Sequence, residues 1–263
     1  MAADYSEECC RLCSGALVPV FARLVLHRFQ VSYFRCAQCE SLQTEPPYWL
    51  AEAYSPTAPS LDIQAITRAL AVRSFICRVL DLLATPRQAT LLDWGAGNGI
   101  LVHLLRDLGT DAYCYDKYVR PLYAEACEPP AKCDVITAFE VWEHFADPLG
   151  ETDRIFGYQP SVHIVSTEFH RDQPEDWTYL HPEIGRHVFF YSERALHFVA
   201  RRHGYDVIHG SRFAVFVNGV IQGSTRTALR ELLENPAGHP GGARMSGDLW
   251  RNDGKTSEAT GSR

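Results

Sequence analysis

One stretch of the chain, Leu91 to Leu101, restricts the possible folds more than any other. It reads LLDWGAGNGIL, an apolar segment that crosses the alternating glycines Gly95, Gly97 and Gly99 and then enters a second apolar segment. Glycine permits a tight turn and lets a ligand lie directly against the backbone. The N-terminus of a following helix offers free N–H groups to an anionic group. The stretch therefore predicts a ligand-binding loop between a buried strand and a helix.

An acidic residue follows this loop at the spacing that a nucleoside-binding fold requires. Asp116 ends the apolar run Tyr113–Asp116, close to the offset of about 20 residues at which a carboxylate receives ribose hydroxyls. The glycine spacing is G-x-G-x-G and not G-x-G-x-x-G, because Ile100 occupies the last position. That difference disfavours a dinucleotide with its pyrophosphate. A strand, loop, helix, strand and acid in this order are stronger evidence than a glycine loop alone.

Apolar patterns alternate between strand and helix through the rest of the chain. Interleaved strands and helices predict an α/β fold with a mostly parallel sheet and right-handed crossovers, and the last two strands predict an antiparallel edge. The segment between Asp116 and Asp134 is too short for a helix, a strand and a helix, so we expect the third strand to be short or missing. We predict strands over 89–94, 111–115, 134–139, 161–167, 206–209 and 212–218, and helices over 63–83, 100–108 and 192–203.

These features together resemble the class I SAM-dependent methyltransferases over residues 63–219. That family has an acid two residues before its first glycine, as Asp93 stands here, and a fourth-strand motif of the form FDVIxxxEVxEH, which residues 133–144 resemble. The resemblance implies a Rossmann-like sheet and SAM as the cofactor. It places Asp116 at the ribose and adds Glu140 to the cofactor-binding residues. Under the methionine part of SAM it places Asp93, Gly95, Gly97 and Gly99.

Two C-x-x-C pairs mark the N-terminal region as a separate module. Cys10 and Cys13 form the first pair, and Cys36 and Cys39 form the second, with a β-rich stretch between them. Four thiolates in two knuckles suit a closed, tetrahedral Zn²⁺ site, in which the metal substitutes for a core that so short a segment cannot build. Cys9 is an alternative ligand to Cys10. The nine cysteines are an odd number, which fits a disulfide framework poorly.

Candidate catalytic residues follow the fourth and fifth strands of the predicted sheet. Glu143 and His144 follow the fourth strand. After the fifth, residues 186–192 are similar to the EHxxYFS segment of sugar C-methyltransferases, which also carry an N-terminal zinc unit. The resemblance aligns His187 with the histidine of those enzymes, where a base removes a proton next to a ketone, whereas Arg186 replaces their glutamate. We therefore expect His187, His144 and Glu143 to handle the acceptor.

The sequence thus predicts a SAM-dependent methyltransferase with a small-molecule acceptor, a nucleotide-linked sugar or related secondary metabolite. One alternative is a quinone or phenol O-methyltransferase, which the EVxEH segment also resembles. The other is a non-catalytic SAM-binding or zinc interaction protein, which Arg186 and the short third-strand region leave open. We expect a zinc-ribbon-like module over 1–45, a linker over 46–62, a methyltransferase domain over 63–222, and a terminal helix with a disordered tail over 223–263.

Composition bears on partners and location. Hydrophobic residues make up 46% of the chain and charged residues 22%, values typical of a folded globular protein. The net charge of −7 disfavours a nucleic-acid partner, because binding to a phosphate backbone needs a basic footprint. A run of apolar residues long enough for a membrane span is not found in the sequence. We therefore expect a cytoplasmic protein without a membrane partner.

Overall fold

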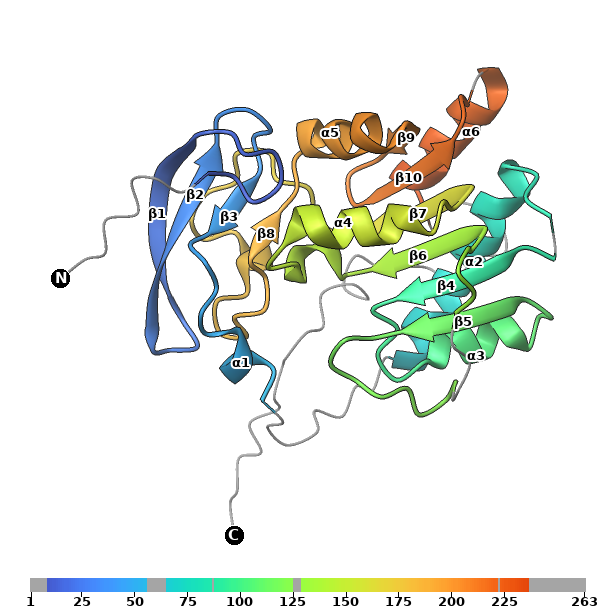
Figure 1. Ribbon diagram of the computed structural model, residues 1–263, viewed down its shortest axis with the longest axis horizontal. Helices are drawn as coiled ribbons and strands as arrows, with labels where there is room; N and C mark the ends of the chain where they lie inside the picture. The colour runs from blue at the N-terminus through green and yellow to red at the C-terminus, as the bar shows by residue number, and fades with distance from the viewer. Residues whose placement is uncertain (1–8, 56–64, 87, 125–128, 222, 237–263) are drawn as a thin grey trace, which may run out of the picture.

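The computed structural model describes residues 9–55, 65–86, 88–124, 129–221 and 223–236. Its centre is a six-stranded sheet with the strand order β5-β4-β6-β7-β10-β9 (Figure 1). The strands pair in parallel from β5 to β7, whereas β10 pairs antiparallel with both of its neighbours. The predicted α/β fold is therefore confirmed. The strands are β4 (Thr90–Trp94), β5 (Asp111–Tyr115), β6 (Val135–Phe139), β7 (Val162–Ser166), β9 (Tyr205–His209) and β10 (Phe213–Asn218).

The third strand of the expected pattern is absent from the described part of 116–134. Among the described strands, β5 therefore lies at the edge of the sheet and pairs with β4. The chain that leaves β5 turns back toward the glycine loop, where the backbone N–H groups of Leu122 and Tyr123 both donate to the carbonyl oxygen of Asn98 at 2.9 Å. The short segment that follows β5 therefore packs against the end of the glycine loop that leads into α3.

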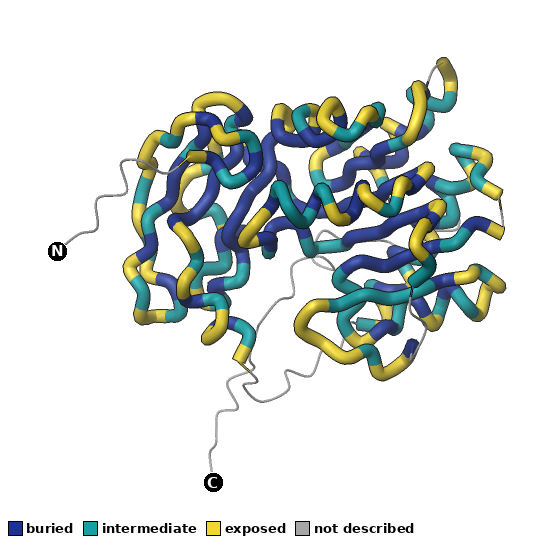
Figure 2. Tube along the Cα trace, viewed as in Figure 1, coloured by how far each residue is buried: buried dark blue, intermediate teal, exposed yellow. Residues whose placement is uncertain are grey.

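Helices cover both faces of this sheet and bury two apolar cores. One core contains residues of α4 and α5 on one face of the sheet, and the other contains residues of α2, α3 and α6 on the opposite face. The inner strands β4, β6, β7 and β10 are buried along most of their length (Figure 2). The helices are α2 (Ala65–Leu82), α3 (Ile100–Arg106), α4 (Pro148–Gly157), α5 (Glu193–His203) and α6 (Gly223–Glu234).

The N-terminal region forms a second, four-stranded sheet with the order β1-β2-β3-β8. Its first three strands come from the cysteine-containing region, but β8 comes from the segment that precedes α5, and it pairs antiparallel with β3. Residues from the two regions thus complete one sheet, which lies beside the larger sheet in Figure 1. The strands are β1 (Leu17–Val25), β2 (Phe29–Cys36), β3 (Leu42–Thr44) and β8 (Phe189–Phe190).

Several elements were not predicted from the sequence. The region predicted as a linker contains the helical turn α1 (Leu50–Ala53), and two 3₁₀ turns, η1 (Trp142–His144) and η2 (Thr178–Leu180), follow β6 and β7. Helix α4 was also missed, although its Asp147-Pro148 start is a recognisable N-cap signal. Residues 237–263 of the predicted C-terminal segment, on which the disordered tail was predicted, lie outside the described residues. Among the described helices, none is both long and apolar enough to cross a membrane.

Candidate functional site

The glycine loop joins the end of β4 to the start of α3. All three glycines have left-handed backbone angles, with φ of +80° at Gly95, +54° at Gly97 and +82° at Gly99. A Cβ atom on Gly95 would lie 2.4 Å from a methyl group of Val141, whereas a Cβ atom on Gly97 would meet no atom within 4 Å. Gly95 therefore permits close packing against the segment after β6, and Gly97 leaves open space above the loop for a ligand.

Asp116 follows β5 and holds the glycine loop in place. Its carboxylate accepts hydrogen bonds from the backbone N–H groups of Gly97 at 2.9 Å and of Tyr118 and Val119 at 2.8 Å. An ionised carboxylate offers about four lone-pair sites, so it retains capacity for a ribose hydroxyl. Asp116 thus fixes the backbone of the loop through these hydrogen bonds. It also lies at the position predicted for ribose binding.

Asp93 lies beneath the loop near the end of β4. Its side chain is buried and accepts a hydrogen bond from the hydroxyl of Thr137 on β6 at 2.7 Å. Burial raises the pKa of the Asp93 carboxyl to about 7, because the charged form loses its hydration. The acid that precedes the first glycine is therefore poised between its two protonation states near neutral pH.

Two adjoining cavities open at this end of the sheet. One has a volume of about 350 Å³ and is lined by Asp93, Gly97 and the start of α2. The other has a volume of about 210 Å³ and is lined by Asp116 and the aromatic residues around it. Three residues line both cavities and so form the wall between them: Gly95, Glu140 and His144.

Glu140, which is part of this wall, and Glu143 share one tyrosine. The Tyr179 hydroxyl oxygen lies 2.9 Å from Oε2 of Glu140 and 2.8 Å from Oε1 of Glu143. A phenol has a single proton and donates it to one carboxylate at a time. Burial, and then the charge of Glu140, raise the pKa of Glu143 well above its ordinary value. Tyr179 is buried and does not line either cavity.

The two predicted catalytic histidines lie beside Glu143. The ring centroids of His144 and His187 are 5.0 Å apart, and the backbone N–H of Val188 donates to the carbonyl oxygen of Glu143 at 2.8 Å. Burial lowers the pKa of His144 to about 3 and that of His187 well below its ordinary value. Burial thus disfavours the charged form of each imidazole, because it removes the hydration of that form. The structure brings all three predicted catalytic residues together, while their role in catalysis stays a prediction.

Two further histidines are not part of this group. His163, which the strand pattern placed in the core, is fully buried, with Nδ1 2.9 Å from the carbonyl oxygen of Ile136. His181 lies in the loop after η2, where Nδ1 is 3.1 Å from a carboxylate oxygen of Glu183. Neither lines the two cavities.

Sequence reasoning missed Tyr54, which lies just after α1. Its ring stacks on that of Tyr118, with centroids 3.8 Å apart, and both line the smaller cavity. Arg186, which replaces the glutamate of the sugar C-methyltransferase segment, lies over the Tyr54 ring at 4.9 Å and donates from Nε to the carbonyl oxygen of Ala53 at 3.0 Å. No local pattern marks Tyr54, because its role depends on the packing of the predicted linker against the domain.

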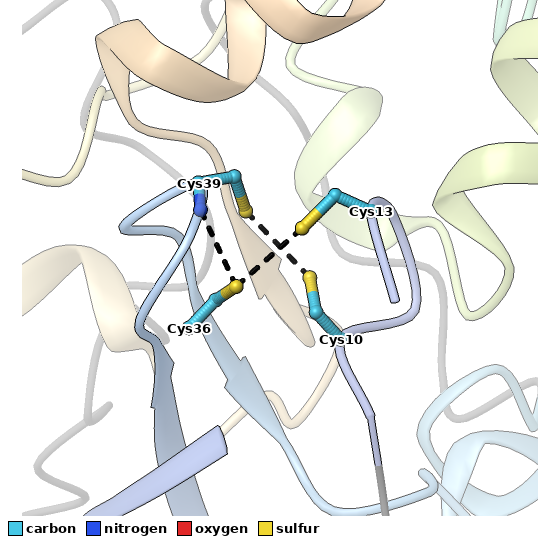
Figure 3. A group of neighbouring side chains, drawn as sticks. All are labelled: Cys10, Cys13, Cys36 and Cys39. Carbon is cyan, nitrogen blue, oxygen red and sulfur yellow. Dashed lines mark hydrogen bonds between the residues drawn. The ribbon is translucent and has the colours of Figure 1, made fainter. Parts of the chain in front are cut away.

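The four predicted zinc ligands converge in the N-terminal module (Figure 3). The Sγ atoms of Cys10 and Cys39 are 3.6 Å apart, and those of Cys13 and Cys36 are 3.5 Å apart. Zinc–sulfur bonds of about 2.3 Å in a tetrahedron place sulfur atoms about 3.8 Å apart, which matches these distances. Burial raises the pKa of the Cys13 thiol to about 12, so a thiolate there needs a cation beside it. The residues present therefore fit Zn²⁺.

Comparison with known proteins places this geometry in a family. Residues 68–210 match the family described as "Methyltransferase domain". Comparison with curated proteins gives no match. Among solved structures, the chain is similar to magnesium protoporphyrin IX methyltransferase from Synechocystis PCC 6803 with bound SAH, at 15% identity and a TM-score of 0.41, covering 65% of this chain and 93% of that one.

A second similar structure is 1,6-didemethyltoxoflavin-N1-methyltransferase from Burkholderia thailandensis, with its substrate and S-adenosylhomocysteine bound. It shares 16% identity at a TM-score of 0.40, and the match covers 75% of this chain and 96% of that one. The family match extends from α2 to the end of β9 and contains the glycine loop, Asp116 and the Glu143–His144–His187 group.

Proposed function

The chain belongs to the methyltransferase domain family and is a SAM-dependent methyltransferase, and we propose that its acceptor is a small molecule, a nucleotide-linked sugar or a related secondary metabolite. The main support for the cofactor site is the open space above Gly97, next to the Asp116 carboxylate. This arrangement suits methionine above the glycine loop and a ribose hydroxyl at Asp116. Asp93 and Glu140 complete the proposed cofactor site beneath and beside the loop.

Methyl transfer from a sulfonium is an in-line displacement. The acceptor atom attacks the methyl carbon, the carbon–sulfur bond breaks, and its electron pair stays on the sulfur of the demethylated product. The enzyme aligns the two reactants and, where the acceptor carries a proton, removes it. His144 lines both cavities. We therefore place the methyl acceptor next to the wall that His144 forms with Glu140. We propose that Glu143, His144 and His187 orient the acceptor there.

A quinone or phenol acceptor is the second candidate. The stacked rings of Tyr54 and Tyr118 line the smaller cavity, and flat aromatic faces favour a planar ring as a neighbour. Identification of the methylated product by mass spectrometry, with sugar nucleotides and catechols offered in parallel, distinguishes the two acceptor classes.

We also propose that Cys10, Cys13, Cys36 and Cys39 hold a structural Zn²⁺. All four positions of a tetrahedral ion are filled by protein thiolates, so the ion supports the fold and takes no part in the reaction. The side chain of Arg11, between the first two ligands, donates to the carbonyl oxygen of Val188 at 2.6 Å and to that of Ala146 at 3.1 Å. The metal thereby stabilises the segment that carries His187.

Calorimetric titration with SAM tests the cofactor site. In the Gly97→Ala variant the added methyl group enters the space assigned to SAM, so we expect Kd to rise at least about tenfold, equivalent to ~1.4 kcal/mol. Gly109→Ala is the matched control, because Gly109 also has a left-handed φ, +81°, and open space around it but lies beyond α3. Asp116→Ala should also weaken binding. Equal SAM affinities of Gly97→Ala and Gly109→Ala would refute the assigned site.

A further inference from the structure

We propose that Glu143, His144 and His187 form an open divalent-cation site that binds an oxygen atom of the methyl acceptor. The inference rests on the proposed function, because it assigns a role at the acceptor side of that site. One carboxylate oxygen and one ring nitrogen from each histidine all lie within 4.8 Å of one another. The three residues come from η1 and from the segment just before β8.

Two polar atoms of this group are buried and have no hydrogen-bond partner among the described residues. They are Oε2 of Glu143 and Nε2 of His144. The Glu143 side chain is 0% exposed, and its other oxygen, Oε1, is already held by Tyr179. A buried polar atom without a partner costs about 1–3 kcal/mol, so protein interiors retain such atoms rarely. A cation between them would satisfy both at once.

His187 is oriented as a metal ligand would be. Its Nδ1 lies 2.6 Å from the carbonyl oxygen of Tyr179, and a carbonyl only accepts, so Nδ1 carries the proton and Nε2 carries the free lone pair. Metal-binding histidines almost always donate their other ring N–H to a carbonyl or carboxylate in this way. The hydrogen bond from Val188 N–H to the carbonyl oxygen of Glu143 fixes the His187 segment against η1.

The donor set identifies the class of cation. Two imidazole nitrogens and one carboxylate oxygen suit Zn²⁺, Mn²⁺ or Fe²⁺, and three protein ligands leave at least one coordination position open. Bond lengths of about 2.1 Å at tetrahedral or octahedral angles place ligand atoms about 3.0–3.4 Å apart. The three atoms lie within 4.8 Å of one another, so cation binding would draw them closer together. The four-cysteine site differs, because its thiolates leave no position open.

The location of the site indicates what would occupy the open position. His144 lines both the cavity above the glycine loop and the cavity beside Asp116, so a cation on its Nε2 lies at the wall between them. A cation there polarises a bound hydroxyl or carbonyl oxygen and lowers the pKa of the acceptor. We therefore expect an acceptor with a hydroxyl, or with a carbonyl next to an acidic C–H, as in sugars, ketones and phenols.

Titration of the full-length protein with Mn²⁺ tests the site, with unbound Mn²⁺ measured by electron paramagnetic resonance. Thiolate sites take Mn²⁺ poorly, so the four cysteines do not interfere. We expect one Mn²⁺ per wild-type chain and at least about tenfold weaker binding in both His144→Asn and His187→Asn. His181→Asn is the matched control, since its ring lies 5.1 Å from that of His187 but outside the three ligands, and it should bind Mn²⁺ as the wild type does.

Absence of Mn²⁺ binding to the wild type, or equal binding by His144→Asn and the wild type, would overturn the proposal. Circular dichroism of each variant shows whether it is folded, and His144→Asn decides the question if His187→Asn does not fold. SAM titrations of the same samples in EDTA separate this proposal from the function itself. SAM binding without Mn²⁺ binding rejects only the cation site, whereas absence of SAM binding rejects the proposed cofactor site.

Discussion

Asp93 is the residue whose chemistry differs most from what its place in the sequence motif suggests. The motif indicates a carboxylate near the cofactor, and the structure buries that carboxylate at 5% exposure beneath the loop. The Thr137 hydroxyl stabilises the charged form, but loss of hydration outweighs this bond and raises the pKa to about 7. In the protein without cofactor, the folded state therefore binds a proton here at pH values where the unfolded chain does not.

This difference predicts a pH dependence of stability. The folded pKa lies above the value of about 3.9 expected for the unfolded chain, so between these values the folded state holds more protons and the free energy of unfolding falls as pH rises, by up to ~1.4 kcal/mol per unit. Asp93→Asn removes this loss. Urea unfolding of the cofactor-free protein at pH 5 and pH 8 should show a smaller decrease for Asp93→Asn than for the wild type. Asp107→Asn, at an exposed position, should behave as the wild type, and an equal decrease in all three proteins would contradict the prediction.

At the scale of elements, helices α4 and α5 begin at side-chain caps with different surroundings. The Asp147 carboxylate accepts from the backbone N–H of Gly150 at 2.9 Å on the surface. The Ser192 hydroxyl accepts from the backbone N–H of Ala195 at 3.1 Å and also donates to the carbonyl oxygen of Cys39 in the second cysteine knuckle. Ser192 therefore connects α5 to the proposed zinc site, whereas Asp147 stabilises its own helix.

Alanine substitutions should separate these two roles. Asp147→Ala should lower the free energy of unfolding by ~1 kcal/mol, the usual loss of an N-cap. Ser192→Ala should cost about 1 kcal/mol more, because it also leaves a buried carbonyl without its donor. Urea denaturation measures both. Ser74→Ala is the control, since the hydrogen bond recorded for that hydroxyl among the described residues lies within α2 and goes to the carbonyl oxygen of Leu70. Equal losses for Asp147→Ala and Ser192→Ala would show that the bond to Cys39 contributes nothing.

At the scale of the whole molecule, the cysteine module and the methyltransferase domain share a core. Cys10, Cys36 and Cys39 belong to the same apolar cluster as residues of α4, α5 and the central sheet. Strand β8 belongs to the sheet of the module and leads directly into α5. Unfolding of the module would expose part of the core of the domain. We therefore expect the module and the domain to unfold together.

Metal removal tests this coupling. A strong chelator should lower the Tm of the whole protein in one cooperative transition, because loss of the ion removes a ligand of the folded state. Far-ultraviolet and near-ultraviolet circular dichroism should report the same midpoint. Cys13→Ser should resemble the chelated wild type, while Cys77→Ser, outside the cluster, should keep the sensitivity to chelator. Two separate transitions would show that the module unfolds independently.

The sequence alone was sufficient for features that depend on local pattern and spacing. Apolar periodicity predicted the six strands of the central sheet and three of its helices, and the segment after Asp116 was short enough to predict the missing third strand. The Ser192 cap and the two cysteine pairs could also be recognised in the sequence, because each pattern involves only a few neighbouring residues. The Asp147 cap of α4 was equally local and was overlooked.

Only the tertiary structure decided which distant residues meet. Nothing in the local sequence indicates that β8 joins the sheet of the cysteine module, or that Tyr54 from the predicted linker stacks on Tyr118. The meeting of Glu143 with His187 likewise depends on a backbone hydrogen bond between segments far apart along the chain. Local propensity acts over a few residues, whereas such contacts are selected by the burial of shared surface when the whole chain packs. The sequence by itself therefore identified the glycine loop and the four cysteines that we propose as zinc ligands, and the packed structure determined the geometry at the proposed acceptor side.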